Sequence, residues 1–224
     1  MLTATDAWRR AYPGASIGVL AIHGVSNPKN HPDLDSRMAD VETDLRRRYS
    51  EGGRPVIRTL PTVQAYTAYY RRFKKTYHVQ GQLESVTVKG RNMPRPSALV
   101  SAMFAAELDN QLLTAGHDLA SIREPVVVGV AAGDESYTML NGKEQTLTEG
   151  DMFIADTDGV MSSIIYGPDK RTPISGDTTD VLFTIYGPEG ISTEQITAHL
   201  EQIRDYVALV SPDASIETLH VLEA

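Results

Sequence analysis

The central apolar segment of the chain carries the side chains best suited to chemistry. Glu107 and Asn110 are three positions apart in the run AMFAAELDN, so they share one face of a helix. A carboxyl group that points into an apolar cavity can bind an amino group, or act as a base with a raised pKa. The alternative is a Glu107 that simply faces solvent.

The second half of the sequence adds hydroxyl, aromatic and guanidinium groups. Ser163 and Ser162 lie in an apolar run, where strand alternation sends one of them inward. Tyr166 precedes a glycine bend, and Arg171 is followed by Thr172. The Arg171 guanidinium can bind a carboxylate or a 3′-terminal phosphate through two parallel hydrogen bonds. A hydrogen-bonded structural serine, a packed aromatic ring and a salt bridge within the loop are the alternatives.

The sequence lacks the usual motifs of cofactor and metal sites. There is no GxGxxG, GxxxxGK[ST] or GxSxG. With no cysteine, disulfides, thiolate nucleophiles and Cys-based zinc sites are excluded, and none of the six histidines has HExxH spacing. His117 and Asp118 are adjacent, but neighbours in sequence rarely face each other, so His117 is either structural or part of a binding pocket. We expect no cofactor and no metal, and we assign no catalytic residue.

Composition and charge limit the partners that can be expected. The chain is 41% hydrophobic with a net charge of -8, which argues against tight RNA binding outside a local basic patch, and we expect no DNA partner. Residues 71–75 (RRFKK) are the densest basic cluster, either a phosphate-facing patch or a solvated helix end. No apolar run approaches the ~20 residues that span a bilayer, so we expect no membrane partner. The lack of cysteine fits a cytoplasmic protein.

These residues must be positioned by helices in the first half and strands in the second. Helical spacing predicts helices over residues 35–49, 62–76, 97–110 and 193–209. Short apolar runs predict strands over residues 17–23, 126–131, 152–155, 160–165, 181–186 and 215–222. Residues 114–118 (TAGHD) are expected to end the third helix with a glycine turn. Asn141-Gly142 predicts a hairpin, and Ser192 with Gln195 predicts a capping box. The pattern is that of an α+β fold.

A series of short motifs runs in a fixed order through residues 128–183. They are Ala131 with Gly133 to Glu135, the hairpin from Leu140 to Gly142, Ala155-Asp156, Gly159, Gly167, and Thr178 or Thr179 before Val181-Leu182. Further motifs are the Tyr-Arg helix from Tyr69 to Phe73, Pro96 to Val100, Gly116 to Asp118, and Arg171-Thr172 with Ile174 and Thr178. In this order and spacing the chain resembles freestanding relatives of the editing domain (B3/B4) of the phenylalanyl-tRNA synthetase beta subunit, over about residues 60–205.

The resemblance implies a β-sandwich of unusual topology flanked by helices. We expect one domain over residues 1–224, with a strand-helix segment at residues 15–53 packed on the core. It also implies a tRNA-binding, RNA-binding domain that hydrolyses the ester of a mischarged tRNA in trans. The partner would be the 3′ end of an aminoacyl-tRNA, or a free amino acid. Such hydrolysis needs polar groups that orient a water, and no covalent nucleophile.

The sequence departs from the family at two positions. Thr184 stands where the synthetase domains place a pocket glutamate, and Ala115 where they place a histidine, with His117 nearby. Three alternatives follow: a deacylase for another amino acid, a binding module without hydrolysis, or an unrelated interaction domain. A pocket would lie between the helix of residues 96–118 and the strands of residues 160–184. The expected substrate-binding residues are Glu107, Asn110, His117, Ser163, Tyr166, Arg171, Thr172 and Thr184.

Overall fold

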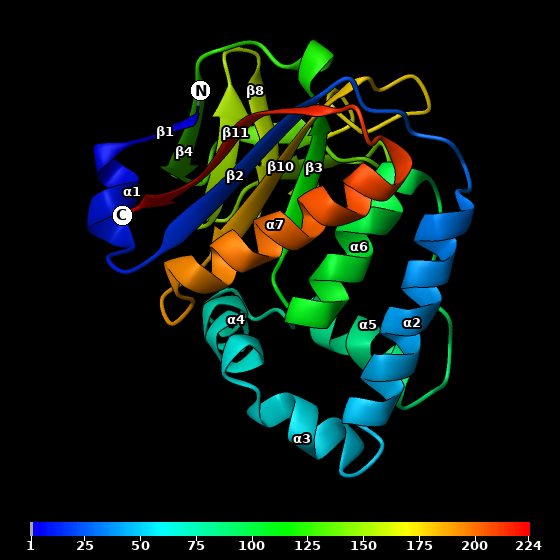
Figure 1. Ribbon diagram of the computed structural model, residues 1–224. Coiled ribbons are helices and arrows are strands. Elements are labelled where there is room, and N and C mark those ends of the chain that lie inside the picture. Colours follow the sequence, from blue (N-terminus) through cyan, green and yellow to red (C-terminus); the bar gives the residue numbers. More distant parts are fainter. Residues whose placement is uncertain (1) are drawn as a thin grey trace.

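Two β-sheets stacked face to face form the centre of the computed structural model, which describes residues 2–224 (Figure 1). The first sheet contains, in spatial order, β1 (Leu2–Ala4), β4 (Val126–Val130), β7 (Met152–Asp156), β8 (Gly159–Ser163) and β9 (Gly167–Pro168). The second contains β11 (Ser215–Glu223), β2 (Ser16–His23), β10 (Asp180–Gly187) and β3 (Thr114–Asp118). A separate hairpin of β5 (Ser136–Thr138) and β6 (Glu144–Thr146) confirms the prediction from Asn141-Gly142.

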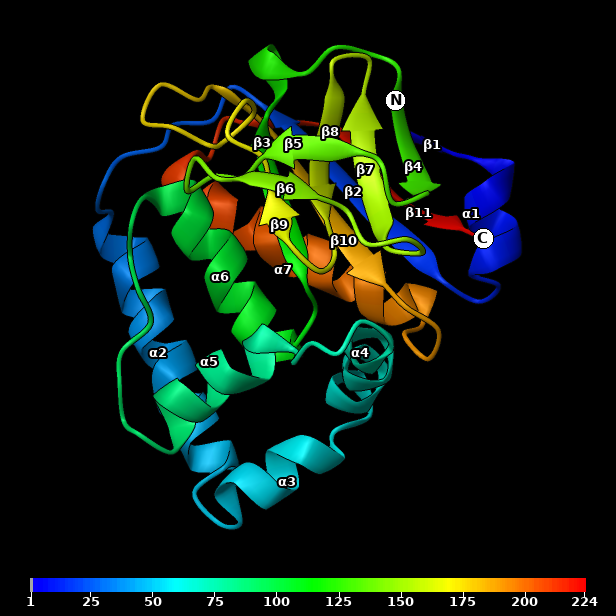
Figure 2. The ribbon, with the colours of Figure 1, turned by 180° about the vertical axis from the view of Figure 1, so that it is seen from behind.

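Helices cover the second sheet and extend beyond one end of the sandwich (Figures 1 and 2). They are α1 (Asp6–Ala11), α2 (Pro32–Arg48), α3 (Gly53–Thr59), α4 (Pro61–Arg72), α5 (His78–Thr87), α6 (Ala98–Asn110), α7 (Thr193–Val210) and the 3-10 turn η1 (Leu119–Ser121). The mixture of sheets and helices confirms the predicted α+β class. No helix within residues 2–224 combines the length and apolarity that a bilayer crossing demands.

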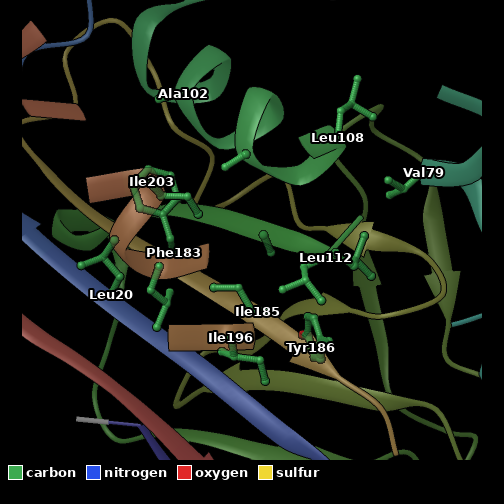
Figure 3. Packing of buried hydrophobic residues seen from close by; sticks show 14 of the residues in the cluster. Leu20, Val79, Ala102, Leu108, Leu112, Phe183, Ile185, Tyr186, Ile196 and Ile203 are labelled. Carbon is green, nitrogen blue, oxygen red and sulfur yellow. The ribbon is translucent and has the colours of Figure 1, made fainter. Parts of the chain in front are cut away.

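Strand β10 has two faces with different surroundings. Phe183 and Ile185 point toward the helices, where Figure 3 shows them with Ile203 of α7 and Ala102 of α6. Because side chains alternate along a strand, Leu182, Thr184 and Tyr186 point the other way, toward the first sheet. The hydroxyl of Tyr186 is 2.7 Å from the Ser162 hydroxyl on β8, which joins the two sheets.

Tyrosines fix the rotation of α4 against the sandwich. Its buried face carries Tyr66, Tyr69 and Tyr70. The Tyr70 hydroxyl donates to the Ile164 carbonyl at 2.6 Å, and the Tyr66 hydroxyl donates to the carbonyl of Tyr186. Buried phenols need such partners, so the tyrosine stripe is held in one orientation and the polar face of α4 is turned outward.

One predicted turn is a strand. Residues 114–118 form β3, which pairs antiparallel with β10 and places Gly116 opposite Phe183. The glycine serves packing and not chain reversal. A Cβ at Gly116 would lie 2.6 Å from Ile174 Cδ1 and 3.2 Å from the sulfur of Met103 on α6. The prediction of a glycine turn was therefore wrong because the small residue admits a close neighbour.

Candidate functional site

The helix side of the second sheet holds Glu107 in a nearly closed environment. Glu107 is 4% exposed, and its Oε2 accepts a hydrogen bond from the Thr114 backbone N–H at 3.0 Å. Burial raises the pKa of Glu107 to about 8, although the Thr114 hydrogen bond lowers it in part. At pH 7 the carboxyl is therefore mostly protonated, which makes it a poor counter-ion for an amino group.

Asn110 belongs to a hydrogen-bonded network between α6 and α7. Its Nδ2 is 3.0 Å from Nδ1 of His199, and the Nε2 of His199 is 2.8 Å from the Thr114 hydroxyl. That hydroxyl donates its proton to the Leu112 carbonyl, so His199 must donate through Nε2 and accept through Nδ1. Burial lowers the pKa of His199 to about 3. Every polar atom of the His199 ring is satisfied by the protein, so the network joins the two helices.

The space between the sheets contains a second series of hydrogen-bonded side chains, centred on His117. The Nδ1 atom of His117 is 2.8 Å from the Thr172 hydroxyl, which donates its own proton to Asp169 Oδ1 at 2.6 Å. Since a hydroxyl has only one proton to donate, His117 must carry its proton on Nδ1. Its Nε2 is then a bare acceptor, fully buried and without a hydrogen-bond partner. Burial, with a smaller effect of Arg171, lowers the pKa of His117 to about 4, so the ring is neutral at pH 7.

Thr184 shares this face with His117. Leu182 lies opposite His117 in the β3–β10 register, and Thr184 is two positions further along β10. His117 and Thr184 are therefore diagonal neighbours on one face of the sheet. The Thr184 hydroxyl is fully buried and has no partner either. Unsatisfied buried polar atoms are uncommon, and His117 Nε2 and Thr184 Oγ1 are two such atoms on one face of the second sheet.

Arg171 is already occupied. Its guanidinium makes two hydrogen bonds to Asp156, at 2.7 and 2.9 Å, and its Nε is 3.6 Å from Asp169. The sequence allowed Arg171 either to bind a ligand or to form a salt bridge within the protein, and the structure has the salt bridge. Arg171 thus helps to position Asp169, and through it the Thr172–His117 chain.

Ser163 and Tyr166 lie apart from both groups, on the far side of β8. The Ser163 hydroxyl accepts the Tyr166 N–H at 3.0 Å. The Tyr166 hydroxyl is 2.6 Å from that of Thr148, and its ring lies beneath the Lys75 ammonium, which is 5.5 Å from the ring centroid. The structure thus distributes the expected residues over three places: Glu107 with Asn110, His117 with Thr172 and Thr184, and Ser163 with Tyr166.

An apolar slot of about 290 Å³ opens between the two sheets, close to the small end of the ~300–1,000 Å³ range of ligand pockets. Both sheets contribute its walls: Leu2, Val19, Ala21, Val126 and Leu182 are among the lining residues. Val19 faces Thr184 across the β2–β10 pair, and Leu182 faces His117 across the β10–β3 pair. The slot thus lies on the same face of the second sheet as the unpartnered atoms of His117 and Thr184. None of Glu107, His117 and Thr184 lines this slot. The slot is therefore not the pocket expected between the helix of residues 96–118 and the strands of residues 160–184, because it opens between β2, β10 and β11 on one side and β1 and β4 on the other.

The mouth of the slot is charged. His23 is held between Asp180, at 2.8 Å from its Nδ1, and Glu217, at 2.9 Å from its Nε2. The carboxylates of Glu217 and Asp180 accept hydrogen bonds from the ring, and these bonds raise the pKa of His23. With two carboxylates around a single cation, the rim stays negative even when His23 is protonated.

Asp169 was missed by the sequence reading. It accepts the Thr172 N–H at 3.1 Å as well as the hydroxyl, which is the local turn that an Asp-x-x-Thr spacing favours. Asp151 was missed too: it is fully buried, accepts the Tyr69 hydroxyl at 2.8 Å, and burial raises its pKa to about 6. Within residues 2–224 no three His, Asp or Glu side chains are grouped closely enough to hold a metal ion.

The fold and the interior hydrogen-bonded residues define the class of the molecule: an α+β domain built on two stacked sheets. The chain superposes on the crystal structure of an N-terminal fragment of the phenylalanyl-tRNA synthetase beta-subunit from Pyrococcus horikoshii with a TM-score of 0.51 and 12% sequence identity. That match covers 96% of this chain and 50% of the fragment, so this chain spans about half the length of its structural relative. No curated protein matches the sequence significantly.

The family model described as the B3/4 domain matches residues 65–207, and the chain belongs to the B3/4 domain family. This confirms the resemblance expected from the order of motifs in the sequence.

Proposed function

We propose that this domain accepts the aminoacyl end of a charged tRNA and hydrolyses its ester in trans. The amino acid side chain would enter the apolar slot between the sheets. The negative rim at His23, Asp180 and Glu217 would attract the amino group. The observation that carries the proposal is the pair of buried, unpartnered polar atoms, His117 Nε2 and Thr184 Oγ1, on the face that the slot shares.

In this mechanism a water is held between the two atoms. Nε2 of His117 accepts a hydrogen bond from the water, and the Thr184 hydroxyl makes a second hydrogen bond to the same water. The water oxygen adds to the ester carbonyl carbon, and one proton of the water passes to the ribose oxygen as the bond between that carbon and the ribose oxygen breaks. The other proton is released to solvent, so the products are the free ribose hydroxyl and the carboxylate of the amino acid. Because its pKa is about 4, the neutral His117 ring orients the water but does not retain a proton taken from it at pH 7. The Asp169–Thr172 chain acts as a positioning device for the ring.

A non-catalytic domain that binds a free amino acid is the second candidate. It is favoured by Thr184, a residue that cannot act as a general base, at the position where the family resemblance expects a glutamate. The slot and its rim would serve an amino acid in the same way, without a reaction.

A panel of aminoacyl-tRNAs distinguishes the two functions. We expect the protein to release the amino acid from one or a few of them. His117→Asn, which keeps a donor for Thr172 but lacks Nε2, should slow release by about tenfold or more. Release that persists in His117→Asn but is lost in Glu107→Gln would place the site on the helix side and contradict this assignment.

Thermal unfolding in the presence of each free amino acid tests the binding function. A ligand of the folded state raises the Tm. A Tm increase with one amino acid, in the absence of any ester hydrolysis, would replace the deacylase by the binding module.

A further inference from the structure

A cationic surface with no role in the proposed reaction lies on α3, α4 and α5, beyond the end of the sandwich (Figure 2). A polar hollow of about 690 Å³ opens there. Its lining combines three cations with four uncharged polar side chains and one alanine: Arg58, Arg71, Lys75, Gln64, Thr67, Thr76, Gln80 and Ala68. No carboxylate lines it, although the chain as a whole carries a net charge of -8.

The cations of this hollow are not neutralised by the protein. Within residues 2–224, the side chains of Arg58 and Arg71 have neither an ion pair nor a hydrogen bond, and both residues are exposed. Other arginines on the helical side differ: Arg54 pairs with Glu84 at 2.8 Å, and Arg48 pairs with Asp44 at 2.6 Å. Unpaired cations gathered around one concavity raise the local potential, which attracts an anion.

The fold holds this arrangement in place. Gln64, Thr67 and Arg71 follow one another at helical spacing on α4, on the face opposite the buried tyrosines. Lys74 then takes a left-handed conformation with φ 56°, which reverses the chain. The reversal brings Lys75 to the hollow, with its ammonium over the Tyr166 ring.

The N-terminus of α5 adds a further favourable element. Thr76 precedes this ten-residue helix and Gln80 lies in its first turn, and both line the hollow. Tyr77, the N-cap residue, makes no side-chain hydrogen bond to the first-turn N–H groups. Free N–H groups and the helix dipole favour an anion beside them. Glu84, to which Gln80 donates, is buried and paired with Arg54, so it does not oppose the anion.

From these observations we propose that the hollow binds phosphate groups of an RNA backbone, and thus anchors the RNA whose 3′ end reaches the interior site. Arg58 and Arg71 supply guanidinium groups that match a phosphate with two parallel hydrogen bonds, and Lys75 supplies a point charge. The inference rests on the proposed function for the identity of the RNA. It identifies a separate surface that binds the backbone.

Fluorescence anisotropy with a labelled RNA hairpin that ends in CCA tests the inference. The variant Arg58→Glu/Arg71→Glu should lose affinity by about tenfold or more at low salt. The magnitude of the slope of log K against log salt should fall by roughly 1.4 to 1.8, because two phosphate contacts are removed. The matched control is Arg10→Glu/Arg91→Glu, which makes the same charge change at two exposed arginines elsewhere, and it should bind nearly as the natural chain does.

Equal loss of affinity in both double variants would mean that only the net charge of the protein matters, and it would overturn the inference. Unchanged binding in both variants would overturn it too. Arg58→Gln/Arg71→Gln, checked by its Tm, should reproduce a smaller loss if the fold is intact. Pyrophosphate provides a separate arm: a Tm increase with pyrophosphate that depends on Arg58 and Arg71, without RNA binding, would assign the hollow to a small phosphorylated ligand and overturn the RNA assignment.

The failure of the inference and the failure of the proposed function have different signatures. RNA binding that depends on Arg58 and Arg71, with no release of any amino acid, leaves the phosphate hollow in place and removes the deacylase. Deacylation with an RNA affinity that is the same in the double variant and the natural chain removes the hollow and leaves the deacylase.

Discussion

The Thr184 hydroxyl is the group whose removal should affect stability and function in opposite directions. Thr184 places a hydroxyl in the interior with no partner, which a fold selected for stability alone would avoid. Thr172 belongs to the series of hydrogen-bonded side chains centred on His117, and its hydroxyl both accepts from His117 and donates to Asp169. The two threonines are therefore opposite cases of the same side chain.

Thr184→Val should raise the free energy of unfolding by about 1 kcal/mol, because valine has the same shape without the unsatisfied hydroxyl. Thr172→Val should lower it by about 1–3 kcal/mol, because Asp169 and His117 both lose a partner. Urea unfolding of the two variants measures both changes. A loss for Thr184→Val as large as that for Thr172→Val would mean that the hydroxyl is hydrogen-bonded. On the proposed function, deacylation by Thr184→Val should fall even as stability rises.

Local signals account for most elements. The helices α2, α4, α6 and α7 and the strand β2 were expected from periodicity, and the Ser192–Gln195 capping box is present. Helices α1, α3 and α5 were missed: α1 has only six residues, α3 has seven and begins at a glycine, and α5 is polar around one short apolar stripe. Such helices are stabilised by contacts with the rest of the fold, which a local pattern does not contain.

The site was harder to predict because its partners are distant in sequence. His117 and Asp118 are adjacent, yet the ring of His117 bonds to Thr172, 55 positions away. Glu107 was rightly expected on a helix within an apolar run, but the sequence could not tell which face of β10 would carry Thr184. Strand register decided that question, and register is set by the whole sheet.

Two glycines with opposite surroundings test how closely α7 packs on the second sheet. A Cβ at Gly18 would lie 2.4 Å from Ile196 Cγ2 and 3.2 Å from Ile185 Cβ, so Gly18→Ala should destabilise the protein by about 1–3 kcal/mol. Gly81 lies inside α5 with nothing within 4 Å of the added Cβ. There Gly81→Ala should stabilise by about 0.5–1 kcal/mol, because alanine favours the helix. Thermal unfolding that ranks the pair in the reverse order would mean that α7 does not sit on Gly18 as described.

At the scale of the molecule, four buried ionisable groups with large pKa shifts contribute to the dependence of stability on pH. Burial raises the pKa of Asp151 to about 6 and that of Glu107 to about 8, and it lowers the pKa of His117 to about 4 and that of His199 to about 3. The histidines take up protons more readily in the unfolded chain, so they lower stability as the pH falls below about 6.5. The two carboxyl groups act in the opposite sense, so the four contributions largely cancel between about pH 4.5 and pH 6.

Above about pH 6.5 the cancellation ends, and Glu107 contributes alone among the four. Its pKa is raised on folding, so the stability it provides is present at low pH and is lost as the pH rises through about 8. The free energy of unfolding should therefore decrease from pH 6.5 to pH 8, by at most roughly 1.4 kcal/mol per pH unit for one proton. Glu107→Gln keeps an acceptor for the Thr114 N–H and cannot ionise, so its profile of unfolding free energy against pH should be flatter by that amount.

His23, whose pKa is also raised, is present in both proteins, and the difference between the two urea-unfolding profiles isolates Glu107. Parallel profiles from pH 6.5 to pH 8 would show that Glu107 is ionised in the folded protein, and would restore it as a candidate for binding an amino group.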